Sequence, residues 1–337
     1  MNNTILITGG AGFIGRSFVE RILSKTNWNI VVLDSLSYAA NVNYLTDSPY
    51  FNAQRVQFVW HDLRAPLNEY LHERIGPVRW IVNIASESHV DRSIAKPVDF
   101  FMNNCALAAN ILEYARTVKP EVFVQVSTDE VYGPAELGYA HREWDTHVPS
   151  NPYAASKSAQ EALAVSYWRT FGVPVVITNT MNNFGPAQHV EKFIPLCVNK
   201  IVNNEPIMVH GKYENGIFIS GSRFWLHADN HADAILFILQ NCPPEQYPNK
   251  CRPSKWHIAG DQEVSNVQIV EKIAEILGKS AIIEPTDFHS SRPGHDLRYA
   301  LDGSKIKQAG WVAPVTFEDS LAQTINWFVK NKVDRIS

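Results

Sequence analysis

Gly9-Gly10-Ala11-Gly12-Phe13-Ile14-Gly15 directly follows the apolar stretch Thr4-Ile5-Leu6-Ile7-Thr8. The apolar stretch predicts a short buried strand, and the residues after the glycines predict a helix to about residue 23. Glycine suits a turn that bends tightly and approaches a pyrophosphate, and the start of a helix offers free N–H groups. Such a turn between a strand and a helix indicates a dinucleotide site. We therefore expect cofactor contacts at Gly9, Gly12, Phe13, Ile14 and Gly15.

Acidic residues follow the next two predicted strands. Asp34 ends the stretch 30–33, and Asp62 comes just after the stretch 56–60. A carboxylate at the end of the second strand can bind ribose hydroxyls and would repel a 2′-phosphate, so NAD is favoured over NADP. The alternative for Asp34 is a turn cap, and Asp62 either reaches the adenine or forms a turn. The remaining residues expected along NAD are Leu63 and, after the strand that starts at residue 80, Ala85.

The stretch Ser127-Thr128-Asp129-Glu130-Val131-Tyr132-Gly133 contains two adjacent carboxylates after a β-branched apolar run, which reads as a buried strand. Downstream, Tyr153-Ala154-Ala155-Ser156-Lys157 places a phenol and an ammonium four residues apart, on one face of a helix. The ammonium should favour the phenolate, which can take a proton from a hydroxyl group. Either pattern alone is common on protein surfaces. Their order after a buried strand indicates a catalytic site at the carboxyl edge of a parallel sheet.

Bulk properties fit an ordinary globular enzyme. With 337 residues, the chain suits two unequal domains. A net charge of −4 gives no electrostatic reason to expect nucleic acid. No apolar run reaches membrane length and no signal peptide is visible, so we expect no membrane association and a cytoplasmic location. The cysteines show no metal or redox spacing, which predicts free thiols and no metal site: Cys105, Cys197, Cys242 and Cys251.

The alternation of strands and helices predicts an α/β fold with a doubly wound parallel sheet, or Rossmann fold. We expect a NAD-binding domain with the catalytic residues over 1–180. A smaller α/β domain over 181–337 should mainly bind substrate, with some segments returning to the first domain. In this second part the sequence predicts a strand over 206–210, a polar loop over 211–222, a helix with a Ser265–Gln268 capping box, and a final helix over 317–329.

The chain resembles the extended short-chain dehydrogenase/reductase family and, within it, the nucleotide-sugar 4,6-dehydratases. The resemblance covers nearly the whole chain and is carried by residues 9–15, 34–41, 86–93, 127–133, 153–157, 182–186 and 292–299. The glycine turn and the Tyr-x-x-x-Lys pair indicate only the broad family. The Thr-Asp-Glu run at 128–130 is similar to the dehydratases specifically, because related epimerases and decarboxylases usually lack the adjacent acids.

The resemblance implies a reaction in three steps. Tyr153 takes the C4 hydroxyl proton of the sugar while NAD takes the C4 hydride, assisted by Thr128 and Lys157. Glu130 then removes the C5 proton as Asp129 protonates the departing C6 hydroxyl. Return of the hydride to C6 gives a 4-keto-6-deoxy sugar. The first substrate that the resemblance implies is dTDP-glucose, with UDP-glucose, UDP-N-acetylglucosamine, or epimerase or decarboxylase chemistry as alternatives. A further alternative is a non-enzymatic NAD-binding regulator.

On the substrate side, the residues expected to bind the nucleotide sugar are Ser88, His89, Asn183, Lys192, Arg223, Arg292 and His295. Arginine suits a diphosphate because it binds oxygens in pairs. Three features depart from the family: Asn179 in place of arginine, Phe224 in place of aspartate, and a longer loop over 213–222. We expect all three on the sugar-nucleotide side, with the loop over the substrate. The apolar helices over 104–118 and after Lys157 favour a homodimer built as a four-helix contact, as the resemblance implies.

Overall fold

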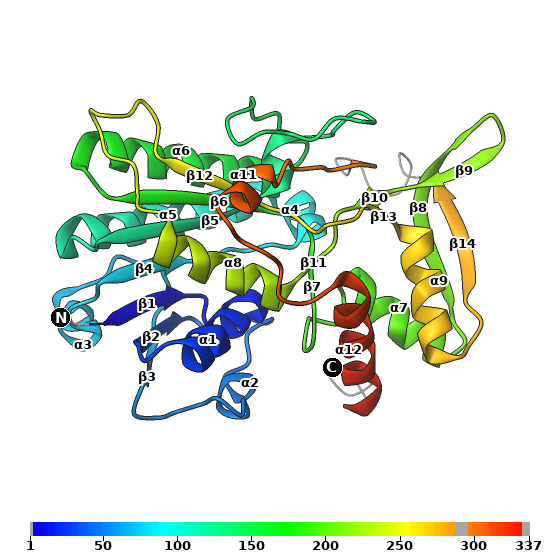
Figure 1. Ribbon diagram of the computed structural model, residues 1–337, viewed down its shortest axis with the longest axis horizontal. Helices are drawn as coiled ribbons and strands as arrows, with labels where there is room; N and C mark the ends of the chain where they lie inside the picture. Colours follow the sequence, from blue (N-terminus) through cyan, green and yellow to red (C-terminus); the bar gives the residue numbers. More distant parts are fainter. Residues whose placement is uncertain (1–2, 288–295, 332–337) are drawn as a thin grey trace.

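The computed structural model describes residues 3–287 and 296–331. Its centre is a seven-stranded sheet with the strand order β12-β6-β5-β4-β1-β2-β3 (Figure 1). All neighbouring strands of this sheet pair in parallel. This confirms the doubly wound fold. The strand bounds are β1 (Thr4–Thr8), β2 (Asn29–Asp34), β3 (Val56–Trp60), β4 (Trp80–Asn83), β5 (Val122–Thr128), β6 (Val175–Thr180) and β12 (Ser254–Ile258).

Two apolar layers cover the faces of this sheet. Successive side chains of a strand point to opposite faces, so Ile5 packs in one layer and Leu6 in the other. The first layer is completed by α1 (Phe13–Lys25), α8 (Ala228–Asn241) and α11 (Ser304–Gln308). The second contains α3 (Glu69–Ile75), α5 (Pro97–Val118) and α6 (Pro152–Phe171). Helix α5 begins seven residues earlier than predicted, because Pro97 suits the first helical turn. The short helices α2 (Asn43–Thr46) and α4 (Val90–Ala95) follow β2 and β4.

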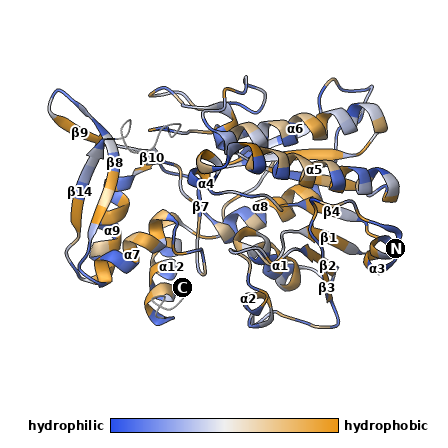
Figure 2. Cartoon of the chain, turned by 180° about the vertical axis from the view of Figure 1, so that it is seen from behind, coloured by the Kyte–Doolittle hydropathy of each residue, from blue (hydrophilic) through white to orange (hydrophobic). Residues whose placement is uncertain are grey.

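The second half of the chain forms a smaller unit with its own apolar core. Its sheet has the order β14-β8-β9, with bounds β8 (Pro206–Glu214), β9 (Ile217–Ser220) and β14 (Ile282–Asp287). Helices α7 (Phe193–Val202), α9 (Asn266–Leu277) and α12 (Phe317–Lys330) pack with it (Figure 2). Two short pairs lie between the units: β7 (Asn183–Phe184) with β11 (Leu226–His227), and β10 (Ser222–Arg223) with β13 (Val264–Ser265). The predicted capping box at Ser265 and Gln268 is confirmed. Both α8 and β12 return to the central sheet.

The predicted polar loop over 211–222 is wrong. Residues 206–220 form the antiparallel hairpin of β8 and β9, in which Glu214 pairs with Ile217. Asn215 and Gly216 connect the strands with φ values of 51° and 80°. Positive φ at both central residues is typical of a tight hairpin turn, and Asn-Gly is its commonest sequence. The tip lies at the opposite end of the molecule from the N-terminus (Figure 1), and Ile217 is 68% exposed. The hairpin therefore projects from the second unit.

Over the described part of the chain, no helix combines the length and the apolar character that a bilayer crossing requires. The four cysteines are free thiols. Within residues 3–287 and 296–331, histidine, cysteine and carboxylate side chains do not gather in a group that could hold a metal ion.

Candidate active site

The glycine turn after β1 leaves no room for side chains where a dinucleotide would approach. Gly9 has a φ of 68°, and a Cβ there would lie 2.9 Å from the backbone of Ala85. A Cβ on Gly15 would lie 2.0 Å from the Gly9 carbonyl oxygen. Gly12 precedes α1 and offers no side-chain cap. The backbone therefore forms a cradle that fits a pyrophosphate at the start of a thirteen-residue helix.

Asp34 closes the other side of this cradle. Its carboxylate accepts hydrogen bonds from the backbone N–H of Ala11 (2.9 Å) and of Leu36 (2.8 Å). Burial raises the pKa of this carboxyl group, and the backbone hydrogen bonds oppose that rise. Asp34 thus caps the turn while it stands beside the glycines, so both predicted roles are compatible. The first helical residues, Phe13 and Ile14, begin α1 directly after this turn.

Asp62 is engaged by a neighbour. Its carboxylate forms an ion pair with Arg64 and accepts the Arg64 backbone N–H over 3.0 Å. The Arg64 side chain holds the pKa of Asp62 below its usual value. Of the two roles that the sequence allowed for Asp62, the ligand-free structure shows the turn. Leu63 is buried, and its carbonyl accepts a hydrogen bond of 2.7 Å from the Asn110 amide.

The catalytic turn starts where β5 ends. Thr128 is the last residue of the strand, and a 3₁₀ turn follows over Asp129–Tyr132. The Thr128 hydroxyl donates to an Asp129 carboxylate oxygen over 2.8 Å. The Thr128 side chain also lies close enough to the Tyr153 phenol to favour its ionised form. The structure therefore brings these predicted catalytic residues together at the carboxyl edge of the sheet.

The two adjacent acids differ in their surroundings. Burial, followed by the charge of Glu130, raises the pKa of Asp129 to about 7. Burial also raises the pKa of Glu130, but a hydrogen bond from Asn151 and the charges of Arg223 and Lys192 lower it. Asp129 can thus keep a proton near neutral pH, while Asn151 and Lys192 favour the charged form of Glu130 against the rise that burial causes in its pKa. Two carboxyl groups in different environments can act as acid and base.

Lys157 and Tyr153 share the buried face of α6. The Lys157 ammonium donates to the Val126 carbonyl and to the Gln160 side chain, both over 2.8 Å. Burial lowers the pKa of Lys157 to about 8. The expected lowering of the pKa of Tyr153 is wrong for the ligand-free protein. Burial and the charge of Glu130 raise that pKa, because they outweigh the contact with Thr128, which favours the phenolate.

Sequence reasoning missed two residues that hold this site. Asn151 is the N-cap of α6: its side chain accepts from the Ala154 N–H over 2.9 Å and donates to the Glu130 carboxylate over 3.0 Å. An asparagine just before a proline at a helix start is a recognisable cap signal. Ser93 accepts the Tyr153 backbone N–H over 3.2 Å. Its position in α4 gives no such signal, because the contact joins residues far apart in the sequence.

Three of the predicted substrate residues gather near Glu191. The His89 ring lies 3.3 Å from the Glu191 carboxylate, and burial lowers the pKa of this histidine. The Lys192 ammonium lies 3.5 Å from the Ser88 carbonyl. Asn183 lies on β7, where its amide group donates to the Thr180 hydroxyl over 3.1 Å. The loop after β4 therefore meets the segment before α7.

Arg223 lies beside the catalytic acids, since its charge lowers the pKa values of Asp129 and Glu130. Its guanidinium group donates to the backbone carbonyls of Asp296 (2.8 Å) and Leu297 (2.7 Å). Arg292 and His295 lie outside the described residues. Arg298, the second arginine of the segment 292–299, forms an ion pair of 2.8 Å with Glu263. Its role is therefore structural.

The placement of Asn179 on the nucleotide side is wrong. Asn179 is fully buried on β6, behind the catalytic turn, and its amide donates to the Thr128 carbonyl over 3.0 Å. The register of β6 against β5 sets this position, because Ser127 faces Asn179 in the sheet. Phe224 packs on an apolar cluster that contains Val131 and Tyr299.

Comparisons with known proteins agree with this geometry. The family model for GDP-mannose 4,6-dehydratase matches residues 6–324. The chain is 35% identical to dTDP-glucose 4,6-dehydratase of Escherichia coli, covering 97% of this chain and 94% of that protein. A crystal structure of the dTDP-glucose 4,6-dehydratase DesIV from Streptomyces venezuelae with NAD and TYD bound is 35% identical, with a TM-score of 0.84 and 98% coverage of both chains. A Thermus thermophilus UDP-glucose 4-epimerase complex with NAD, 24% identical over 97% of this chain and 99% of the other, shares the fold with a TM-score of 0.83.

Proposed function

The chain belongs to the GDP-mannose 4,6-dehydratase family of the extended short-chain dehydrogenases/reductases, and we propose that it is an NAD-dependent dTDP-glucose 4,6-dehydratase. The observation that carries the proposal is the pair of adjacent, differently placed acids at the end of β5. Asp129 has a pKa near 7 and touches Thr128, while Glu130 is held by Asn151. An elimination needs an acid and a base on neighbouring atoms, and this pair supplies both.

The residues that would hold NAD are the glycine cradle, Asp34 and the buried Lys157. Glycine at positions 9 and 15 lets the turn pack closely on neighbouring backbone, and the start of α1 then offers free N–H groups to a pyrophosphate. The Asp34 carboxylate stands where it can bind ribose hydroxyls and repel a 2′-phosphate. When bound, NAD would supply the hydride acceptor at C4 and the hydride donor at C6. We extend this site to Asp62, Leu63 and Ala85, as the sequence predicted.

The first proton transfer belongs to Tyr153. Its phenol lies within hydrogen-bonding reach of Thr128, at the open carboxyl edge of the sheet. Lys157, one helical turn away, holds its ammonium against the end of β5. In the free protein, burial raises the pKa of Tyr153 because it disfavours the negatively charged phenolate. A bound ligand with positive charge near the phenol would therefore lower this pKa. Tyr153 then takes the C4 hydroxyl proton of the hexose.

Water loss belongs to the acid pair. Once C4 carries a ketone, the proton on C5 is acidic, and Glu130 removes it. Asp129 gives its own proton to the C6 hydroxyl, which departs as water. The raised pKa of Asp129 suits this role, since the proton is retained near neutral pH until the leaving group takes it. An epimerase on the same fold has no elimination that would require these two acids.

The nucleotide sugar is proposed to lie between the two units, against Ser88, His89, Asn183, Lys192 and Arg223. A product-mass assay tests the activity and the base. The protein is incubated with dTDP-glucose, UDP-glucose, GDP-mannose and UDP-N-acetylglucosamine. The proposal requires loss of one water from dTDP-glucose at a higher kcat/KM than from the others. An isomer of unchanged mass would instead indicate epimerase chemistry.

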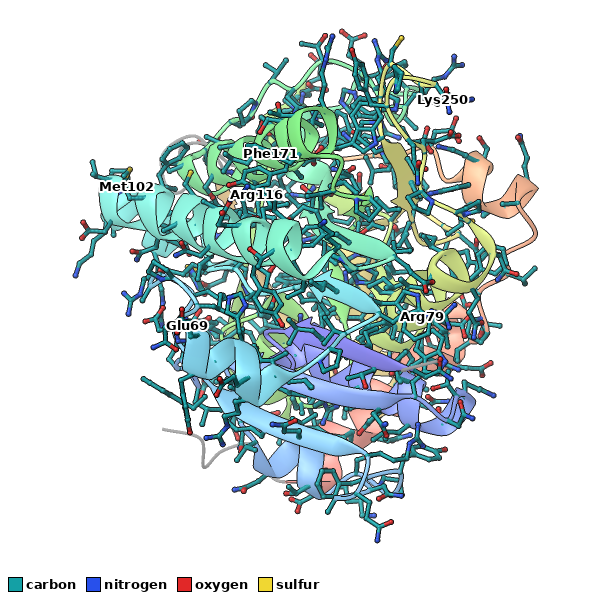
Figure 3. All side chains as sticks on the ribbon, turned by 90° about the vertical axis from the view of Figure 1, so that its left-hand side faces the viewer. Glu69, Arg79, Met102, Arg116, Phe171 and Lys250 are labelled. Carbon is teal, nitrogen blue, oxygen red and sulfur yellow. The ribbon has the colours of Figure 1, made fainter. Side chains whose placement is uncertain are left out.

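We also propose a homodimer that forms through α5 and α6, with a cytoplasmic location where nucleotide sugars and NAD are present. Figure 3 shows the two helices side by side, with Met102 at one end of α5. Val98 and Met102 on α5 are 71% and 60% exposed, and Phe171 at the end of α6 is 50% exposed. Apolar side chains on adjacent helices suit a four-helix contact between two copies.

A further inference from the structure

A buried charged cluster lies behind the catalytic turn, and the proposed chemistry does not use it. Glu161 on α6 and Lys255 on β12 form an ion pair of 2.7 Å, with side chains only 3% and 1% exposed. His147 lies 3.5 Å from the same carboxylate oxygen and 3.2 Å from the Lys255 ammonium. Because buried charges are unfavourable unless they are paired and hydrogen-bonded, an ion pair here calls for a structural explanation.

Asn179 connects this cluster to the catalytic turn. Its side-chain nitrogen donates to the Glu161 carboxylate over 2.7 Å and to the Thr128 carbonyl over 3.0 Å. That carbonyl belongs to the peptide group that joins Thr128 to Asp129. The contact therefore fixes the orientation of the peptide group that directly precedes the two acids. The second oxygen of Glu161 is the one that accepts from Lys255, so each carboxylate oxygen has its own partner.

We propose that Asn179, held in place by the Glu161–Lys255 ion pair, is a positioning residue that fixes the direction of Asp129 and Glu130. The inference rests on the proposed dehydratase function for its kinetic test. Within the turn, the hydrogen bond from the Glu130 backbone N–H to the Thr128 hydroxyl is long, at 3.4 Å. Small displacements of catalytic groups slow a reaction on the order of a hundredfold.

The main test replaces Asn179 with leucine, which has a similar volume and no amide group. Two measurements follow. Amide hydrogen exchange in the ligand-free protein reports on residues 129–132. Rapid mixing with dTDP-glucose reports reduced cofactor by its absorbance and water loss by product mass. Asn179→Leu should speed exchange of the turn and slow water loss on the order of tenfold to a hundredfold, while formation of reduced cofactor changes little. If Asn179→Leu does not fold, the same measurements are made on Asn179→Ser, whose smaller side chain causes no steric clash.

Two further variants separate the charge from the hydrogen bond. Lys255→Met removes the ammonium partner of the Glu161 carboxylate and should mimic Asn179→Leu. Adding Glu161→Gln removes the remaining charge but keeps an oxygen for Asn179, so the double variant should recover most of the rate of water loss. Asn230→Leu is the matched control, because the Asn230 amide is buried and holds the backbone of Val315 over 2.8 Å. It should leave exchange of the turn unchanged.

Native exchange of the turn in Asn179→Leu would overturn the proposal. So would an equal slowing of hydride transfer and water loss in all variants, the Asn230→Leu control included. The exchange measurement needs no substrate. If the unmodified protein does not dehydrate dTDP-glucose, the proposed function fails, while the exchange result still decides whether Asn179 positions the turn.

Discussion

The side-chain amide of Asn151 donates to the Glu130 carboxylate over 3.0 Å, while its oxygen caps the helix that carries Tyr153 and Lys157. One side chain thus joins the proposed base of the elimination to the helix of the hydride-transfer step. The bond also lowers the pKa of Glu130, against the effect of burial. A single residue therefore contacts both Glu130 and the start of α6.

Asn151→Asp should keep the helix cap but place a second carboxylate beside Glu130. Loss of the donor and repulsion between like charges should raise the pKa of Glu130, so the base is protonated over more of the neutral range. Water loss should slow at pH 7 and recover as the pH rises. The rate of water loss between pH 6 and 9 measures this effect. Asn151→Ser, which also caps a helix, is the control, and an identical pH profile for both variants would contradict the prediction.

Asp129→Asn should stabilise the protein above neutral pH. The pKa of Asp129 is raised from 3.8 to about 7 in the folded protein, so folding favours the protonated form. The associated stability is present below about pH 4 and is lost as the pH rises toward 7. Because one unit of pKa shift corresponds to about 1.4 kcal/mol, the variant should gain a few kcal/mol over the native protein at pH 8 and little at pH 4. Urea unfolding at both pH values tests this, and an equal difference at both would count against a protonated Asp129.

Asp34→Asn should weaken discrimination against NADP. The amide retains an oxygen that can accept from Ala11 or Leu36, but it removes the charge that repels a 2′-phosphate. We expect the ratio of NADP to NAD dissociation constants to fall by about tenfold or more, since like-charge repulsion in a binding site is worth over 1 kcal/mol. Binding titrations with both cofactors provide the measurement. The prediction fails if the native protein already binds NADP as tightly as NAD.

Met102→Glu should weaken the proposed dimer. The side chain is 60% exposed on α5, so the substitution disturbs little within one protomer but places a charge in the four-helix contact. Light scattering should show a dimer for the native protein and a shift toward monomer for the variant at the same micromolar concentration. Tyr70→Glu, a change of similar size at a 63% exposed position on α3, should remain dimeric. A native protein that is monomeric throughout would contradict the interface.

Periodicity and local motifs were sufficient to predict the central sheet. The strand at 56–60 and the capping box at Ser265 have local signals, and both are confirmed. The hairpin of β8 and β9 replaces the predicted polar loop because the Asn-Gly turn favours strand pairing despite the polar residues and glycines around it. The site residues at 128–130 span the end of β5, so the topology alone places them at the carboxyl edge of the sheet.

The remaining features depend on register and long-range contacts, which one sequence does not reveal. The departure of Asn179 from the family pattern predicts a place on the substrate side, but pairing of β6 with β5 places it beside the Thr128 carbonyl. The partner of Glu161 is Lys255, which lies 94 residues later on the outermost strand. The pKa of Tyr153 was expected to follow Lys157, but burial dominates it, and burial is a property of the folded chain.

Rapid mixing of Glu130→Gln and Tyr153→Phe with dTDP-glucose, each loaded with NAD, tests the proposed dehydratase chemistry most directly. Absorbance of the reduced cofactor reports hydride transfer, and product mass reports water loss. Glu130→Gln should form reduced cofactor at a near-native rate and then lose water roughly a hundredfold to ten-thousandfold more slowly. Tyr153→Phe should form almost no reduced cofactor. Water loss from Glu130→Gln at the native rate would contradict the assignment, because the acid pair would then have no part in the elimination.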